Sequence, residues 1–233
     1  MQDFARRFHF GVQGITATEA ETREVIGQML GAGRAVRAFD TEMSLVPFVR
    51  GLLPEGFPVH VPIAYPMGNV PPALKAAEAG RALDLGVVDI CISLDIRAAL
   101  SGRWDDIAAD VALVEEAWGA EFAGPGGYLA HIVPGQILDE ASLLECCEAV
   151  RRGGGQVIKI NPGAGLHVSP EQIAAIFERF GHDAFDVHPS GGIRDYDSAI
   201  AYLRMGCTTI HTRSALEIIA EYERRQREGI ALV

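Results

Sequence analysis

Residues 156–180 read QVIKINPGAGLHVSPEQIAAIFERF, a short β-branched run followed by a helical pattern. The apolar run 157–160 predicts a buried strand over residues 156–160, and the spacing of apolar residues after Ser169 predicts an amphipathic helix. Units of this kind, a short strand and then a helix, recur along the whole chain. Strands that alternate with helices are expected to be parallel, because a parallel pair needs a crossover connection between its strands.

Eight such units predict an α/β fold, a (β/α)8 TIM barrel that forms a single domain over residues 1–233. The expected strands cover residues 8–12, 35–39, 59–64, 88–94, 128–133, 156–160, 184–188 and 208–212. The expected helices begin near Thr18, Thr41, Pro71, Trp104, Asp139, Ser169, Tyr196 and Arg213. An open, doubly wound sheet is the structural alternative, but the first strand is not followed by the Gly-x-Gly-x-x-Gly pattern typical of that fold.

Local signals predict where several helices begin and end. Thr18, followed three residues later by Glu21, is the pattern of a capping box. Glycines are expected where helices stop, because glycine adopts the left-handed conformation that often ends a helix. These glycines are Gly33, Gly86, Gly119, Gly153 and Gly206.

The amino-acid composition limits the kinds of molecule that this protein is expected to bind. The formal net charge is −11 and 48% of the residues are hydrophobic. This charge argues against nucleic acid or an anionic membrane as the partner. No secretion signal, membrane-spanning stretch or metal-finger cysteine spacing is present in the sequence. We therefore expect a cytoplasmic protein with a small-molecule substrate, no cofactor and no bound metal, and the sequence leaves a homo-oligomer open.

Lys159 is one of only two lysines in the chain, and it stands inside the apolar run 157–160. Burial among apolar side chains disfavours a charged ammonium, and a neutral lysine is a nucleophile toward carbonyl groups. The alternative is a lysine at a strand end whose amine reaches solvent or a single carboxylate. Lys75, the other lysine, lies near the helix start at Pro71, where we expect a solvated amine.

The barrel prediction also indicates which side chains meet. In a (β/α)8 barrel the chemistry takes place at the C-terminal ends of the strands, and side chains alternate between the inside and the outside of each strand. By these rules six side chains are expected to face one mouth of the barrel. They are His9, Asp40, Cys91, Lys159, His188 and His211.

Three segments carry a recognisable pattern. They are residues 65–78 (YPMGNVPPALKAAE), residues 157–163 (VIKINPG) and residues 187–194 (VHPSGGIR), which continue to AIAYLRMG at 199–206. Together they resemble the deoxyribose-phosphate aldolases, class I aldolases with a (β/α)8 barrel and a lysine that forms a Schiff base. The resemblance runs from about Thr16 to Ala220 and is most specific after residue 60.

The resemblance implies roles for individual residues. Lys159 stands where the family has its Schiff-base lysine. His188 stands where the family has a second lysine, whose charge favours the neutral nucleophile, and Cys91 stands where the family has a proton-relaying aspartate. His9 falls near another family aspartate on the first strand. We therefore predict that Lys159, His188 and Cys91 are catalytic.

A second set of residues is predicted to bind an anionic group of the substrate. Gly191 and Gly192 present backbone N–H groups ahead of a helix, and the resemblance implies that this loop and Arg194 hold the anion. The family's phosphate-binding run, roughly Gly-Thr-Ser-Ser-Gly, is here HTRSA at residues 211–215, which we interpret as a preference for another anion, such as a carboxylate or a displaced phosphate. The alternative for Arg213 is a solvated residue paired with Glu217. The predicted substrate-binding residues are Gly191, Gly192, Arg194, Arg213, Ser214, His211, Asp40 and His9.

Three functions stay open. The first is an aldolase-like lyase that uses a Schiff base on Lys159 to form or cleave a C–C bond of a small carbonyl substrate other than deoxyribose-5-phosphate. The second is a barrel that has lost catalysis and serves as a binding or structural subunit. The third is a metal-dependent barrel enzyme whose candidate ligands are His9, His188, His211 and Cys91. The retained Lys159 in a lysine-poor chain favours the first.

Overall fold

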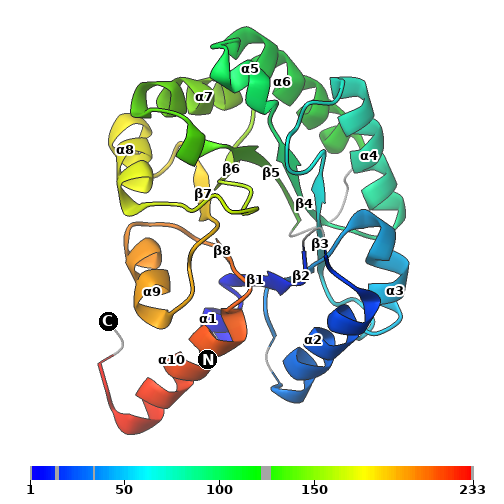
Figure 1. The fold of residues 1–233 in the computed structure, drawn as a ribbon, viewed down its shortest axis with the longest axis vertical. Helices are drawn as coiled ribbons and strands as arrows, with labels where there is room; N and C mark the ends of the chain where they lie inside the picture. Colours follow the sequence, from blue (N-terminus) through cyan, green and yellow to red (C-terminus); the bar gives the residue numbers. More distant parts are fainter. Residues whose placement is uncertain (1, 14–15, 34, 122–126, 232–233) are drawn as a thin grey trace.

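Eight parallel strands form the barrel that the sequence predicts (Figure 1). The computed structural model describes residues 2–13, 16–33, 35–121 and 127–231. Neighbouring strands pair in parallel from β1 to β7, and β8 pairs with β1. A bridge between Ser190 and His211 joins the end of β7 to β8 and completes the ring. The strands are β1 (Phe8–Gly11), β2 (Ala38–Asp40), β3 (Val59–Ile63), β4 (Asp89–Ser93), β5 (Tyr128–Val133), β6 (Val157–Ile160), β7 (Asp186–Pro189) and β8 (Ile210–His211).

Helices surround this ring, so that each strand is followed by at least one helix (Figure 1). The longer helices are α2 (Glu19–Gly31), α4 (Pro72–Asp84), α6 (Trp104–Glu121), α7 (Glu140–Arg152), α8 (Pro170–Phe180), α9 (Tyr196–Arg204) and α10 (Ala215–Glu228). The shorter ones are α1 (Gln2–Ala5), η1 (Met43–Leu45), α3 (Val46–Arg50), α5 (Ile96–Leu100) and η2 (Gly135–Ile137). The (β/α)8 prediction is confirmed, and every strand overlaps its predicted range.

The predicted helix boundaries are correct where a side chain caps the helix. Thr18 caps α2 by accepting a hydrogen bond from the backbone N–H of Glu21 (3.1 Å). The reciprocal bond of a capping box does not form among the described residues, because the Glu21 carboxylate pairs with Arg213 instead (3.1 Å). The prediction that Gly119 ends a helix is wrong, since α6 continues to Glu121. A single glycine costs a helix only about 1 kcal/mol, which packing overrides.

The two sides of the strand ring differ in chemistry. Between the strands and the helices, outward-facing residues such as Phe39, Ile90 and Ile158 belong to one continuous apolar core. A small second cluster of Cys91, Ala130 and Ile132 packs apart from this core. The strands also bury a set of polar side chains: His9, Asp40, His60, Asp89, Lys159, His188 and His211. Buried polar groups are unfavourable unless they are paired, so this polar set marks the region in which to look for function.

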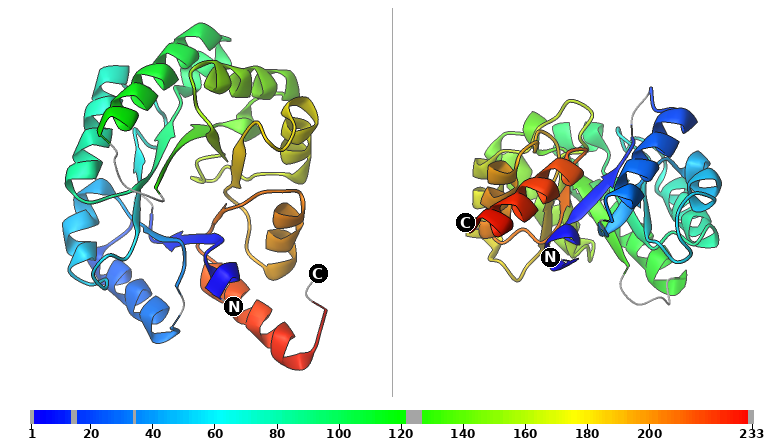
Figure 2. Two further views of the ribbon diagram at one scale, coloured as in Figure 1. Left: turned by 180° about the vertical axis from the view of Figure 1, so that it is seen from behind. Right: turned by 90° about the horizontal axis from the view of Figure 1, so that it is seen from below.

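The first and last helices lie side by side. Figure 2 shows α1 next to α10, and the rings of Phe4 and Tyr222 stack with their centroids 4.0 Å apart. This contact packs α1 against α10 on the outside of the barrel, where α10 also packs against β1. Among the described residues, no helix has the length and apolar composition needed to cross a membrane.

Lys75 is buried, and the expectation of a solvated amine at this position is wrong. Its Nζ atom donates hydrogen bonds to the carboxylate of Asp110 and to the backbone carbonyl oxygen of Ser93 (3.0 Å). Lys75 lies on α4 and Asp110 on α6, and these two helices pack against each other. The sequence does not reveal the pair, because its partners are 35 positions apart.

Replacing Lys75 by methionine is expected to destabilise the fold by about 3–5 kcal/mol, because the Asp110 carboxylate would stay buried without a partner. Urea unfolding followed by circular dichroism measures this loss. The double variant Lys75→Met, Asp110→Leu removes both charges and should recover most of the stability. A loss below about 1 kcal/mol in the single variant would mean that the pair is worth no more than a surface ion pair.

Candidate active site

A cavity opens at the C-terminal ends of the strands, where the sequence predicts the active site. Its volume is about 240 Å³. Predicted site residues line it: Lys159, Gly191, Gly192, Arg194, Arg213, Ser214, His211 and Asp40. The other lining residues are Gly11, Gln13, Tyr65, Pro162, Gly163, Ala164, Ser190, Ile193 and Thr212. The loops that the sequence motifs singled out therefore meet around one cavity.

Lys159 reaches the cavity from β6 with 2% of the residue exposed. In the sheet it lies between Ile132 of β5 and His188 of β7. Among the described residues, Lys159 has no hydrogen bond and no carboxylate within ion-pair distance. Its amine is therefore buried, faces a cavity and lacks a counterion.

The chain turns directly after this strand. Asn161 has a φ of 67°, in the left-handed region that asparagine tolerates better than most residues. Its side-chain oxygen accepts a hydrogen bond from the backbone N–H of Gln136 (2.8 Å), which fixes the turn. The turn places the next residues, Pro162 and Gly163, in the wall of the cavity beside Lys159.

The predicted anion-binding loop forms another part of the wall. Gly191 and Gly192 have φ values of 86° and 83°, and a Cβ atom on Gly191 would lie only 2.1 Å from the carbonyl oxygen of Leu166. Only glycine fits this position without distortion. Arg213 is 70% exposed and pairs with Glu21 rather than with Glu217, so its guanidinium lies at the rim of the cavity.

Three predicted site residues are buried beside the cavity and do not line it: His9, Cys91 and His188. His188 lies next to Lys159 in the register of β6 and β7, with Nε2 3.2 Å from a carboxylate oxygen of Asp186. Burial lowers the pKa of His188, although Asp186 opposes the shift. Near neutral pH His188 is therefore an uncharged imidazole.

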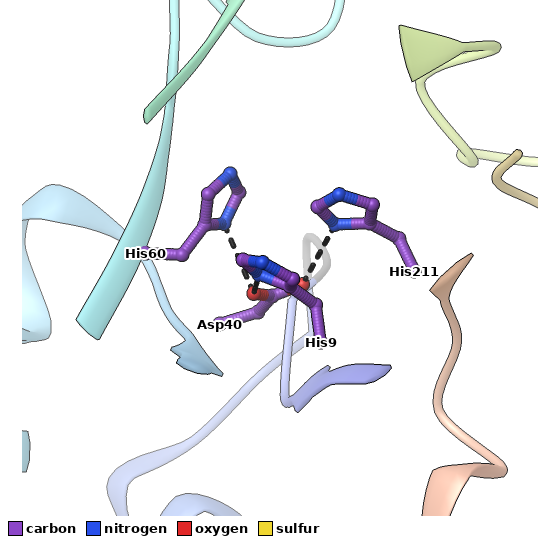
Figure 3. A group of neighbouring side chains, drawn as sticks. All are labelled: His9, Asp40, His60 and His211. Atoms are coloured by element: carbon purple, nitrogen blue, oxygen red, sulfur yellow. Dashed lines mark hydrogen bonds and ion pairs between the residues drawn. The ribbon is translucent and has the colours of Figure 1, made fainter. Parts of the chain in front are cut away.

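Four buried side chains converge from β8, β1, β2 and β3, and we call them the Asp40 cluster: His9, Asp40, His60 and His211 (Figure 3). The Nδ1 atoms of all three imidazoles face the Asp40 carboxylate. The distances are 2.8 Å from His9 to Oδ1, 3.0 Å from His60 to Oδ1 and 3.4 Å from His211 to Oδ2. Asp40 and His211 also line the cavity, so the cluster forms part of its floor.

Tyr128 and Cys91 contact the ring nitrogens of the Asp40 cluster that face away from Asp40. The hydroxyl oxygen of Tyr128 lies 3.0 Å from Nε2 of His9 and 3.3 Å from Nε2 of His211. On the other side, Nε2 of His60 lies 3.0 Å from the sulfur of Cys91. Both ring nitrogens of each histidine therefore face a polar atom.

The ionisation of the cluster follows from burial and from these contacts. Burial lowers the pKa of His9 to about 3 and holds that of His211 well below its ordinary value. Burial alone would raise the pKa of Asp40, but His60 and His9 hold it well below its ordinary value. For His60, Cys91 and Asp40 overcome the effect of burial and raise the pKa to about 10. Without any further ion, the cluster contains the pair Asp40–His60 and two neutral imidazoles.

Comparison with known proteins places the chain in a family. No family model matches the sequence. The chain is 30% identical over 205 residues to the deoxyribose-phosphate aldolase of Micrococcus luteus, over 87% of this chain and 89% of the relative. The chain belongs to the deoxyribose-phosphate aldolase family. Membership of this aldolase family confirms the predicted class of enzyme, a lyase.

Solved aldolase structures share the fold of this family member. QR15, an aldolase, superimposes with a TM-score of 0.83 at 22% identity, over 98% of this chain and 99% of QR15. The deoxyribose-phosphate aldolase of Aeropyrum pernix, described as a unique tetramer, gives a TM-score of 0.79 at 20% identity, over 95% and 92% of the two chains. At these identities the likeness concerns the barrel fold.

Three residues of this aldolase-family chain belong to the site although the sequence did not point to them. They are Tyr65, His60 and Tyr128. His60 and Tyr128 lie on predicted strands. The alternation of side chains along a strand, which predicted that His9 faces the inside of the barrel, could have been used for these two residues as well. Their partners come from other strands, so no spacing along the chain marks them. Tyr65 lies in the recognised segment 65–78, but nothing in that segment points its side chain toward the cavity.

Proposed function

We propose that this protein is a class I aldolase-like lyase in which Lys159 forms a Schiff base with a small carbonyl substrate that carries an anionic group. The contrast between the two buried lysines carries the proposal. Lys75 is paired with Asp110 and Ser93, whereas Lys159 faces the cavity and has no carboxylate partner among the described residues. An amine that faces the cavity without a carboxylate partner is positioned to attack a substrate carbonyl.

The covalent steps need only this amine and proton transfers. The Lys159 nitrogen adds to the carbonyl carbon, and the carbinolamine loses water to give an iminium ion. When the neighbouring C–C bond breaks, its electron pair moves to the iminium and an enamine forms. Protonation of the enamine carbon and addition of water then release the product and restore the amine. The reverse sequence forms the bond.

Residues of the cavity wall are positioned to transfer the protons. Asp40 and His211 line the cavity together with Lys159, and a carboxylate beside a neutral imidazole suits a general base. His188 and Cys91 remain catalytic candidates as buried groups that exchange protons with the wall without touching the substrate. A neutral His188 does not supply the permanent cation of the family's second lysine.

The anionic group of the substrate is proposed to bind at Gly191, Gly192 and Arg194, with Ser214 and Arg213 at the rim. His9 is fully buried, so its part is to hold Asp40 from behind. The run 211–215, of which residues 211–214 line the cavity, differs from the family's phosphate-binding run, which supports a substrate other than deoxyribose-5-phosphate.

Borohydride trapping tests the Schiff base. The protein is incubated with pyruvate, acetaldehyde, dihydroxyacetone or a sugar phosphate, reduced, digested and analysed by mass spectrometry. An adduct is expected on Lys159 with at least one of these compounds. Lys75 is an internal control, because a buried and ion-paired ammonium is a poor nucleophile. Absence of an adduct on Lys159 with every compound, in protein with intact circular dichroism, contradicts the proposal and favours a non-catalytic barrel.

A further inference from the structure

We propose that the Asp40 cluster is a binding site for one divalent transition-metal ion, best matched to zinc, that cross-links β8, β1, β2 and β3. The cluster offers three imidazole nitrogens and one carboxylate oxygen, all of which lie within 4.8 Å of one another (Figure 3). Imidazole and carboxylate are common zinc ligands, and zinc prefers four ligands in a tetrahedron. The site does not rest on the Schiff-base proposal.

The distances from the three imidazoles to the Asp40 carboxylate are close to those in such a tetrahedron. Zinc lies about 2.0–2.1 Å from nitrogen and oxygen ligands, so two ligands of a tetrahedral ion are about 3.3 Å apart. The Nδ1 atoms of His9, His60 and His211 lie 2.8, 3.0 and 3.4 Å from the Asp40 carboxylate oxygens. His60 Nδ1 also lacks hydrogen-bond geometry toward Asp40 and has no hydrogen-bond partner among the described residues. This arrangement, described above as an ion pair, also fits two ligands that share an ion.

A count of protons supports the same conclusion. Without an ion, the Nδ1 atoms of His9 and His211 must carry protons to bond to Asp40, and their Nε2 atoms are then acceptors. Both Nε2 atoms face the Tyr128 hydroxyl, which has a single proton to donate. With an ion on Nδ1, both Nε2 atoms carry protons, and the two lone pairs of the Tyr128 oxygen accept both. Metal-bound histidines usually donate their other N–H to such an outer partner.

The site lies where the paired stretches of neighbouring strands are short. The register pairs are two between β1 and β8, three between β1 and β2, and two between β2 and β3. Between β3 and β7, each neighbouring pair has four or five. An ion held by His211, His9, Asp40 and His60 joins one side chain from each of the four weakly paired strands.

In the ion-bound protein Lys159 would still form the Schiff base, whereas Asp40 and His211 would hold the ion instead of transferring protons. Catalytic zinc sites keep one position open for water or substrate, whereas structural sites are closed by protein ligands. Four protein ligands close the tetrahedron, so the proposed ion is structural. The sequence-based expectation of no bound metal considered His9, His188, His211 and Cys91, a set that the structure does not assemble, since His188 and Cys91 lie outside the cluster.

Metal binding to the full chain tests the proposal. The protein is stripped with a chelator, dialysed against zinc chloride and analysed for metal and for Tm. We expect close to one zinc ion per chain and a higher Tm, because an ion that binds only the folded state stabilises it. Cobalt(II) should give the visible absorption of a tetrahedral ion. Failure to retain zinc, or a cobalt spectrum typical of six-coordinate hydrated ion, overturns the proposal.

Variants locate the ion. His60→Gln should remove most of the zinc, whereas His131→Gln should keep it, because His131 is an equally buried histidine that pairs with Glu115 (2.8 Å) outside the cluster. Tyr128→Phe keeps all four ligands and should weaken zinc affinity about 10–100-fold. His60→Gln lacks one ligand and Tyr128→Phe lacks none, so the two variants should retain different amounts of zinc. Equal zinc retention would overturn the assignment of His60 as a ligand, even if one variant folds poorly. Borohydride trapping of Lys159 is measured independently of zinc content. The Schiff-base proposal and the zinc proposal can therefore each fail without the other.

Discussion

Replacing Lys159 by arginine is expected to lower hydrogen exchange at the α-carbon of a bound carbonyl compound by at least about 10³-fold, because the covalent nucleophile is lost. An enamine takes up deuterium from D2O at this carbon, so proton NMR follows the reaction without knowledge of the natural substrate. The probe is whichever compound the wild-type protein traps. Arginine is similar in length and volume to lysine, but its guanidinium stays protonated and forms no Schiff base.

The matched control for this experiment is Lys75→Arg. Arginine can still pair with Asp110, and Lys75 lies between α4 and α6, outside the cavity. Exchange by this variant should stay close to that of the wild type. Exchange by Lys159→Arg at more than a tenth of the wild-type rate would point to enolisation by a base such as Asp40, without a Schiff base.

Deoxyribose-5-phosphate is expected to be cleaved about 10²–10⁴-fold more slowly by this protein than by the Micrococcus luteus relative. This range is what general acid–base assistance usually contributes, and it depends on groups whose charge suits the substrate. Here a neutral His188 occupies the position next to Lys159 in the sheet, and His211 and Arg213 line the part of the cavity where the family binds phosphate. Coupled detection of the released glyceraldehyde phosphate compares the two enzymes at equal concentration.

Two reversions test the cause of this difference. His188→Lys restores the family's second lysine beside Lys159, and Cys91→Asp restores its aspartate. A gain of cleavage in either variant, or in both combined, would identify these positions as the switch. Cleavage by the unmodified protein at the rate of the relative would show that our interpretation of the two substitutions is wrong.

The fold was predictable because its signals are local. Each strand and helix is encoded by apolar periodicity over a short window, as in residues 156–180, and eight repeats of the unit leave few alternatives. The boundary at Gly119 was not predictable, since packing along α6 outweighs the preference of one residue. The loops around the cavity were found from short motifs at strand ends.

The polar network behind the cavity was not predictable from spacing. His9, Asp40, His60 and His211 come from four strands, and only the closure of the barrel brings β8 beside β1. The Lys75–Asp110 pair depends in the same way on the packing of α4 against α6. In both cases the sequence shows which residues carry chemistry, whereas the pairing depends on tertiary structure.

Both lysines of this chain lie below the surface, Lys75 at 0% and Lys159 at 2% exposure. The outer face of the barrel therefore presents no lysine amine. Acylating reagents too large to enter the cavity, such as N-hydroxysuccinimide esters of bulky dyes, would therefore find no lysine on that face. A reductive label small enough to enter the cavity would mark Lys159 instead, which makes this side chain a separately addressable position for conjugation.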